Sequence, residues 1–167
     1  MRKKVLITEA VSDVGLNFLR ENGYELVIGT GPSEATLLKE CPDCDGALTR
    51  NGKFTAQVFD ACPKLKVVSM HGIGVDGIDV DAATVRGIQV CNAAESNQRS
   101  VAEYAIGLIL MLAKQSVTYH NGLKNGKMMD VRKVYGSDVS GKPLGIIGMG
   151  NIGTQVARMA AHGLGMN

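Results

Sequence analysis

Short apolar runs alternate with helix-like stretches along the first hundred residues. Each run of four or five mostly apolar residues predicts a strand, and five such runs occur at 5–8, 24–28, 46–49, 65–69 and 88–91. The stretches between them carry apolar residues at helical spacing, and residues able to cap a helix precede four of them: Ser12, Ser33, Thr55 and Asp81. Buried strands separated by helices are typical of a parallel sheet with both faces covered. The sequence therefore predicts an α/β fold for residues 1–98, a flavodoxin-like parallel sheet with helices on both faces.

The pattern changes after residue 92. Residues 93–99 are polar and predict a loop, and Ser100 with Glu103 three residues later predicts a capped helix that continues to Ala113. This helix is apolar nearly all round, so we expect it to be buried between layers or at an interface. Polar residues and four glycines at 121–142 predict an extended connection. Residues 99–142 are thus expected to link two domains.

A glycine motif follows, with Gly148, Gly150 and Gly153 in G-x-G-x-x-G spacing. An apolar run at 144–147 precedes it and a helix-like stretch at 154–161 follows, which is the strand, turn and helix that the motif requires. The first glycine permits a tight turn, the second lets the backbone approach a pyrophosphate, and the third lets helix pack on strand. We predict a dinucleotide site here. The alternative is a glycine-rich turn that binds no ligand.

Residues 143–167 supply only the beginning of such a domain. A dinucleotide fold has two β-α-β-α-β halves, and its ribose-binding carboxylate lies about 20 residues beyond the motif. No Asp or Glu follows Asp138. We therefore expect residues 143–167 to be the incomplete start of a Rossmann domain, in the front portion of a longer enzyme or in a natural truncation.

Composition narrows the choice of partners. The net charge of +2 is too small to indicate nucleic acid or an anionic membrane. The longest apolar stretch, 105–113, is far shorter than a membrane span, so a soluble cytoplasmic protein is expected. Four cysteines include a C-x-x-C at Cys41 and Cys44, but no second pair or histidine at ligand spacing accompanies it. We expect reduced thiols, with neither a metal site nor a redox site.

Four segments, 65–79, 82–88, 100–103 and 144–153, resemble the D-isomer-specific 2-hydroxyacid dehydrogenases, in the order that this family has them, and most resemble its phosphoglycerate dehydrogenase-like branch. The resemblance implies that the first domain binds a 2-hydroxy or 2-oxo acid and that the glycine-motif domain binds NAD. It implies hydride transfer between the 2-hydroxy acid and the nicotinamide. It also implies a homodimer formed through the long helix and the connection after it.

The resemblance and the local chemistry together select candidate substrate-binding residues. Successive N–H groups of Gly72, Ile73 and Gly74 suit a carboxylate, with the glycines free to adopt positive φ; the alternative is a tight turn without a ligand. Arg50 follows the third strand and is a candidate partner for a carboxylate or phosphate, or else a solvated surface arginine. Asn97 matches a substrate-contacting loop position, its alternative being an Asx turn.

The cofactor-binding candidates are Val101, Gly148, Gly150, Asn151, Ile152 and Gly153. His71 is expected to be part of the loop scaffold or rim. Gly77 stands where the family usually has Asn, and glycine tolerates the same left-handed backbone, so we expect little functional cost. The catalytic Arg, Glu and His of the family come after the glycine motif, so no catalytic residue is assigned here. A non-catalytic dimerising module of the same family is the alternative function.

Overall fold

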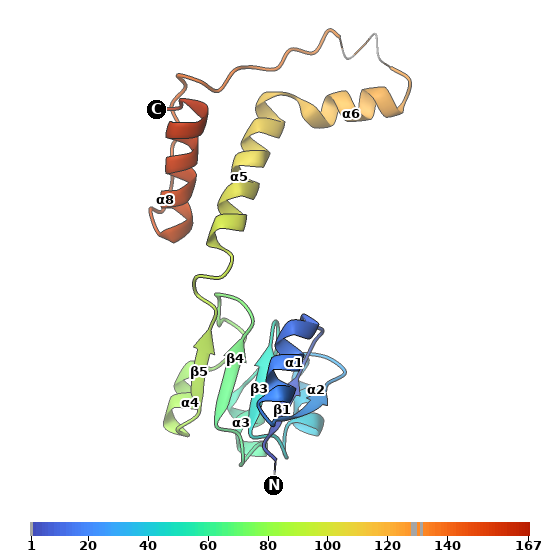
Figure 1. Ribbon diagram of the computed structural model, residues 1–167, viewed down its shortest axis with the longest axis vertical. Coiled ribbons are helices and arrows are strands. Elements are labelled where there is room, and N and C mark those ends of the chain that lie inside the picture. Colours follow the sequence, from blue (N-terminus) through green and yellow to red (C-terminus); the bar gives the residue numbers. More distant parts are fainter. Residues whose placement is uncertain (1, 128–129, 131) are drawn as a thin grey trace. The chain divides into compact units, whose positions relative to one another are not determined.

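The computed structural model describes residues 2–127, 130 and 132–167, and its chain forms two compact units, Met1–Ser96 and Asn97–Asn167 (Figure 1). The first unit contains a five-stranded sheet in the order β2-β1-β3-β4-β5, with every neighbouring pair parallel. Its strands are β1 (Lys4–Ile7), β2 (Glu25–Ile28), β3 (Gly46–Thr49), β4 (Val67–Met70) and β5 (Gln89–Asn92). This order is that of a flavodoxin-like sheet, which confirms the predicted fold class.

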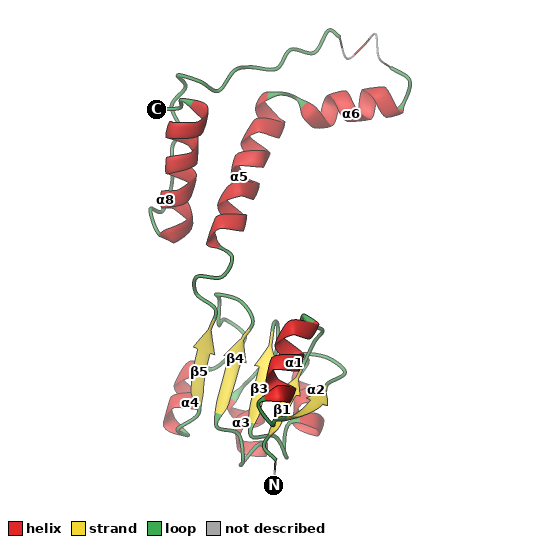
Figure 2. Cartoon of the chain, viewed as in Figure 1, coloured by secondary structure: helices red, strands yellow, loops and turns green. Residues whose placement is uncertain are grey.

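Four helices connect these strands: α1 (Asp13–Glu21), α2 (Glu34–Glu40), α3 (Ala56–Ala61) and α4 (Val80–Val85). Figure 2 shows α1 in front of the sheet and the other three behind it. The main core lies on the side of α2, α3 and α4, where the fully buried side chains include Leu6, Phe54, Val58 and Val68. The helices therefore cover both faces as predicted, but they cover them unequally.

The helix caps follow the sequence prediction at three of four positions. The side chains of Ser12, Ser33 and Thr55 each accept a backbone N–H in the first turn of α1, α2 and α3. The predicted cap at Asp81 is wrong. The N-cap residue of α4 is Asp79, two residues earlier, and its Oδ1 accepts the N–H of Ala82 at 2.9 Å. A bridge between residues 54 and 78 keeps the chain extended up to this point, so the helix begins directly after it.

The second unit contains α5 (Gln98–Ala113), α6 (Ser116–Lys124), α8 (Asn151–Arg158) and the π-helical turn η1 (Met159–Gly163). The predicted start of α5 at Ser100 is wrong, since the helix begins at Gln98 and Ser100 lies inside its first turn. The capping box is not formed because Glu103 pairs with Arg99, whose Nε lies 2.8 Å from Oε1. The predicted connection at 121–142 is also partly wrong, because α6 extends to Lys124.

The predicted strand at 144–147 is absent from the described residues. Leu144 N–H donates to the carbonyl of Asn167 at 2.7 Å, and Asn167 N–H donates to the carbonyl of Lys142 at 3.0 Å. These two bonds form one step of a parallel ladder. A strand needs a ladder of such hydrogen bonds that continues along its length, and a single pair of bonds does not provide one.

Helix α5 packs along α8, and the two run in the same direction (Figure 1). Ala102 is its one buried residue, whereas Tyr104 and Leu112 are 70% and 75% exposed. Burial between layers, the first of the two expectations for this helix, is therefore not found in the part of the chain that the structure describes. An apolar surface of this kind is suited to an interface.

Candidate functional site

The carboxyl ends of all five strands meet at one edge of the sheet, because the strands are parallel. Strands β1 and β3 are neighbours there, although β2 lies between them in the sequence and on the far side of β1 in the sheet. The order of strands therefore changes direction between β1 and β3. Ligands of doubly wound sheets bind at this kind of switch point. Glu9 follows β1 there and Arg50 follows β3.

Two buried threonines hold this edge together. Thr8 Oγ1 lies 2.9 Å from Thr49 Oγ1, and both residues are about 1% exposed. Thr49 Oγ1 also accepts the N–H of Gly52 at 2.8 Å, and the Thr49 carbonyl accepts the N–H of His71 at 2.7 Å. Buried hydroxyl groups with satisfied hydrogen bonds make a rigid base. The loops after β1, β3 and β4 thus begin from fixed positions.

Glu9 binds the loop that follows β3. Its Oε2 accepts the N–H groups of Arg50 and Asn51 at 3.0 and 2.8 Å, and its Oε1 accepts Asn51 Nδ2 at 2.7 Å. Burial opposes ionisation of Glu9, but the hydrogen bonds from Asn51, Arg50 and Thr8 outweigh it and lower the pKa of the carboxyl. Glu9 lies at the candidate site, and the sequence did not single it out.

Arg50, a predicted substrate-binding residue, lies at this edge with an exposed side chain. Its guanidinium makes no hydrogen bond or ion pair with any residue that the structure describes. Its five N–H donors are therefore available to a carboxylate or phosphate, for which their fork geometry is suited. The predicted location after β3 is observed, and the ligand contact stays a prediction.

The predicted residues Gly72, Ile73 and Gly74 form the loop after β4, next to the Arg50 segment because β3 pairs with β4. The carbonyls of Gly72 and Ile73 accept the Ala93 N–H at 2.8 Å and Asn92 Nδ2 at 2.7 Å. The three N–H groups donate to no other residue within the described ranges. This loop is therefore held through its carbonyls, and its donors stay open to an anion.

The expected backbone of this loop is partly wrong. Neither Gly72 nor Gly74 has a positive φ, so the alternating right- and left-handed residues of a nest are not formed. Gly77 has no positive φ either, so the left-handed backbone that glycine tolerates is not used there. A Cβ at Gly77 would lie 2.7 Å from the carbonyl oxygen of Gly52, so close packing of two loops explains the glycine. The backbone is otherwise fixed here by the Phe54 N–H, which donates to the Gly77 carbonyl at 2.9 Å.

The glycine motif in the second unit has the geometry of a phosphate-binding turn. Gly148 has φ +94°, a region that suits glycine, and Gly150 is the N-cap residue of α8. A Cβ on Gly153 would lie 2.1 Å from the Gly148 carbonyl oxygen, so the third glycine lets the helix pack on the turn. A Cβ on Gly150 would meet no atom within 4 Å, which leaves open space beside the helix N-terminus.

The first turn of α8 supplies the donors for an anion. The N–H groups of Asn151, Ile152 and Gly153 donate to no residue in the described part of the chain, whereas the N–H of Thr154 donates to the Gly150 carbonyl at 2.9 Å. Free N–H groups at a helix N-terminus, together with the helix dipole, favour a phosphate group. The residues present therefore fit the pyrophosphate of a dinucleotide.

Asn97 and Val101 belong to the unit that carries this turn. Asn97 is the exposed N-cap residue of α5, and its side chain makes no capping hydrogen bond. Val101 lies in the first turn of α5 and is 39% exposed. Both side chains are accessible, and their contacts with substrate and cofactor stay predictions.

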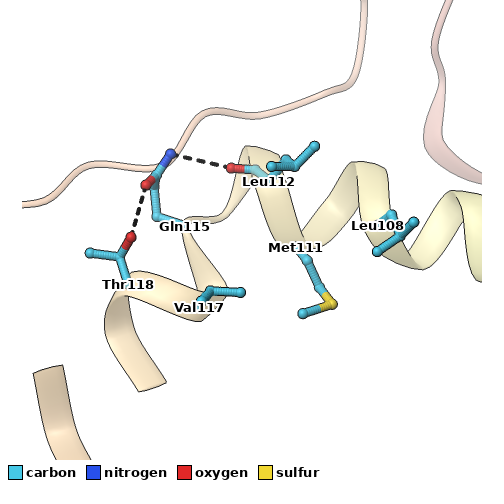
Figure 3. Close-up of a pocket in the computed structure, with 6 residues that line it drawn as sticks. All are labelled: Leu108, Met111, Leu112, Gln115, Val117 and Thr118. Carbon is cyan, nitrogen blue, oxygen red and sulfur yellow. Dashed lines mark hydrogen bonds between the residues drawn. The ribbon is translucent and has the colours of Figure 1, made fainter. Parts of the chain in front are cut away.

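A small apolar pocket lies at the bend between α5 and α6 (Figure 3). Gln115 has a left-handed φ of 53° there; its Nε2 donates to the Leu112 carbonyl at 3.3 Å, and its Oε1 accepts the Thr118 hydroxyl at 3.2 Å. The pocket holds about 170 Å³, and Leu108, Met111 and Val117 complete its lining. It has no charged or nucleophilic group, so it is suited to apolar contact and not to catalysis.

Further chemistry is limited in the described ranges. They contain no group of three His, Cys, Asp or Glu side chains able to hold a metal ion. Cys41, Cys44 and Cys62 are buried in the core, and a hydrogen bond with Cys62, together with burial, raises the pKa of Cys41. Among described helices, none alone is long and apolar enough to cross a membrane; α5 and α6 meet that test only as a pair bent by 65°.

Comparison with known proteins connects both candidate regions to one family. Residues 5–162 match the model of the D-isomer specific 2-hydroxyacid dehydrogenase catalytic domain. Similar curated proteins include the D-3-phosphoglycerate dehydrogenases of Archaeoglobus fulgidus and Homo sapiens, each 38% identical over 93% and 97% of this chain. The chain spans 29% and 31% of the length of these two relatives.

Solved structures show the same architecture. The TT0316 protein from Thermus thermophilus is 31% identical, with a TM-score of 0.88 over 98% of this chain. An NAD-dependent formate dehydrogenase from Staphylococcus aureus in complex with NAD is 30% identical, with a TM-score of 0.80 over 97% of this chain. The matched region is 54% of each of those chains.

Proposed function

Because this chain belongs to the D-isomer specific 2-hydroxyacid dehydrogenase family, we propose that it binds the substrate and the cofactor pyrophosphate of an NAD-dependent oxidoreductase that acts on a 2-hydroxy or 2-oxo acid. The names of the similar curated proteins favour D-3-phosphoglycerate as the 2-hydroxy acid. The observation that carries the proposal is the family match, which runs through both candidate regions in one chain.

In this proposal the substrate's carboxylate binds at the carboxyl edge of the sheet. The open N–H groups of Gly72, Ile73 and Gly74 supply neutral donors, and Arg50 supplies a positive charge beside them. Hydrogen bonds in which the acceptor is charged are stronger than neutral ones, so an oxyanion is favoured over a neutral ligand. Asn97 is proposed as a further substrate contact. This edge orients the substrate and does not itself move the hydride.

The proposed cofactor is NAD, whose nicotinamide would supply the hydride chemistry. The turn at Gly148, Gly150 and Gly153 would hold its pyrophosphate against the N–H groups of Asn151 and Ile152, with Val101 as an apolar neighbour. The proposal for this chain concerns binding of the substrate and of the cofactor pyrophosphate, and turnover is not part of it.

Calorimetry tests the substrate part of this proposal. We expect D-3-phosphoglycerate and glycolate, which share a 2-hydroxy carboxylate, to bind the 167-residue chain. Substitution of Arg50 by Ala should weaken both by about tenfold, since one charge-assisted contact is removed. Inorganic phosphate is the control for a non-specific anion site. Binding of phosphate as tightly as glycolate would argue against a 2-hydroxy acid site.

A second proposed function is that of a non-catalytic module that forms a homodimer. The exposed apolar side chains along α5 and α6, including Leu108, Met111, Leu112 and Val117, favour self-association. A dimer in light scattering, together with no anion binding in calorimetry, would favour this second function. We propose neither a nucleic-acid partner nor a membrane partner. The four cysteines are unpaired, which supports a cytoplasmic location.

A further inference from the structure

Glu9 joins two segments that lie far apart in the sequence and flank the switch point of the sheet. Its Oε2 accepts the backbone N–H groups of Arg50 and Asn51 at 3.0 and 2.8 Å, across separations of 41 and 42 residues. Its Oε1 accepts Asn51 Nδ2 at 2.7 Å. One carboxylate therefore binds the first two residues of the loop that follows β3.

This loop has few other restraints before Gly52. Arg50 and Asn51 are exposed, and the guanidinium of Arg50 contacts no described residue through a hydrogen bond or ion pair. The next hydrogen bond along the loop is that of the Gly52 N–H, which donates to the buried Thr49 Oγ1 at 2.8 Å. The backbone of Arg50 is thus held between a buried hydroxyl on one side and the Glu9 carboxylate on the other.

We propose that Glu9 is a positioning residue of the substrate site, which holds the Arg50 backbone where the Arg50 side chain can bind the anionic group of the substrate. The inference rests on the proposed role of Arg50. A misplacement of about 1 Å in such a group is enough to lose much of its binding, since charge-assisted hydrogen bonds depend on geometry. Glu9 itself does not contact the substrate in this proposal.

The sign of the effect separates positioning from electrostatics. A carboxylate beside an anion site repels the ligand, so charge alone predicts that removal of Glu9 strengthens binding. Positioning predicts the opposite, because Arg50 loses its restraint. Lower affinity after removal of a negative charge is therefore a result that simple electrostatics does not produce.

The test is the affinity of the 167-residue chain for D-3-phosphoglycerate, measured by calorimetry. Glu9→Ala removes every acceptor and should weaken binding by at least about fivefold. Glu9→Gln keeps an acceptor oxygen for the two N–H groups, so binding within about twofold of the unchanged protein is expected. Glu21→Ala is the matched control, since it removes the same charge at the exposed end of α1. In an Arg50→Ala background, Glu9→Ala should cause no further loss.

The amide signals of Arg50 and Asn51 show whether the loop has moved in each variant. Equal or tighter binding by Glu9→Ala overturns the inference, as does a loss that persists unchanged in the Arg50→Ala background. If Glu9→Ala does not fold, Glu9→Asp replaces it; this variant keeps the charge, shortens the reach by one methylene, and should lose affinity in the same way. Absence of binding by the unchanged protein refutes the proposed function itself, and it thereby also refutes the proposed role of Glu9.

Discussion

Two glycines of the same turn should respond differently to replacement by alanine. A Cβ on Gly153 would lie 2.1 Å from the Gly148 carbonyl oxygen, well inside the 3.0 Å that real Cβ atoms keep from their neighbours, so the turn or the helix must move by about 0.9 Å. Such overpacking costs about 1–3 kcal/mol. Alanine recovers at most about 1 kcal/mol of helix propensity. Gly153→Ala should therefore destabilise the turn by up to about 2 kcal/mol.

Gly150→Ala is the matched variant, because a Cβ there meets nothing within 4 Å and φ is −75°. Replacement of a glycine N-cap by alanine costs about 0.5–1 kcal/mol of helix stability. Alanine also lowers the conformational entropy of the unfolded chain, which stabilises the folded state by about the same amount. The expected change in stability is within about 0.5 kcal/mol. The added methyl group would nevertheless occupy the space proposed for a pyrophosphate.

Amide hydrogen exchange across Asn151–Arg158 measures both effects at the turn itself. We expect faster exchange in Gly153→Ala and unchanged exchange in Gly150→Ala. Equal destabilisation by the two variants would refute the reasoning, since it would mean that the second glycine has a structural role. A fully stable Gly153→Ala would show that the helix does not pack on Gly148 as described.

Three further predictions concern other parts of the chain. Gly77→Ala should destabilise the first unit by about 1–3 kcal/mol in urea unfolding, because its Cβ would lie 2.7 Å from the Gly52 carbonyl oxygen. Gly15→Ala is the matched variant inside α1, where a Cβ would meet no atom within 4 Å. It should stabilise the unit by about 0.5–1 kcal/mol, because alanine has the higher helix propensity. Leu112→Glu should shift light scattering toward monomer if the α5 surface forms a homodimer, and an unchanged assembly state would exclude this face. The hydrogen bonds of Glu9 lower its pKa, so they stabilise the fold at pH values above the ordinary value of 4.5, and this contribution is lost as pH falls through the lowered pKa. Glu9→Gln should therefore flatten that part of the plot of unfolding free energy against pH. An identical plot for the variant would contradict the assignment.

Local signals in the sequence predicted most of the first unit. The caps at Ser12, Ser33 and Thr55 were predictable because each depends on a side chain and a backbone group within three residues of each other. The cap at Asp79 was not, because the bridge from residue 54 selects it over Asp81. Pairing between residues that are far apart in the sequence cannot be predicted from the residues next to the cap.

The candidate site was predictable in part for the same reason. Arg50 and the loop of Gly72 and Gly74 follow predicted strands, so their placement at one edge follows from a parallel sheet. Glu9 also follows a predicted strand, but its importance depends on β1 and β3 being neighbours, which strand prediction alone does not give. Gly72 and Gly74 are free to adopt a positive φ but do not do so; the carbonyls of Gly72 and Ile73 instead accept hydrogen bonds from Ala93 and Asn92, which hold the loop in a different backbone conformation.

The location of the substrate site is tested most directly by NMR titration of the 167-residue chain with D-3-phosphoglycerate. We predict that the largest amide shifts occur at Gly72, Ile73, Gly74 and Arg50, and that Arg50→Ala abolishes most of them at the same ligand concentration. Shifts confined to other surfaces, or no shifts in the unchanged protein at millimolar ligand, would contradict a 2-hydroxy acid site at the carboxyl edge of the sheet.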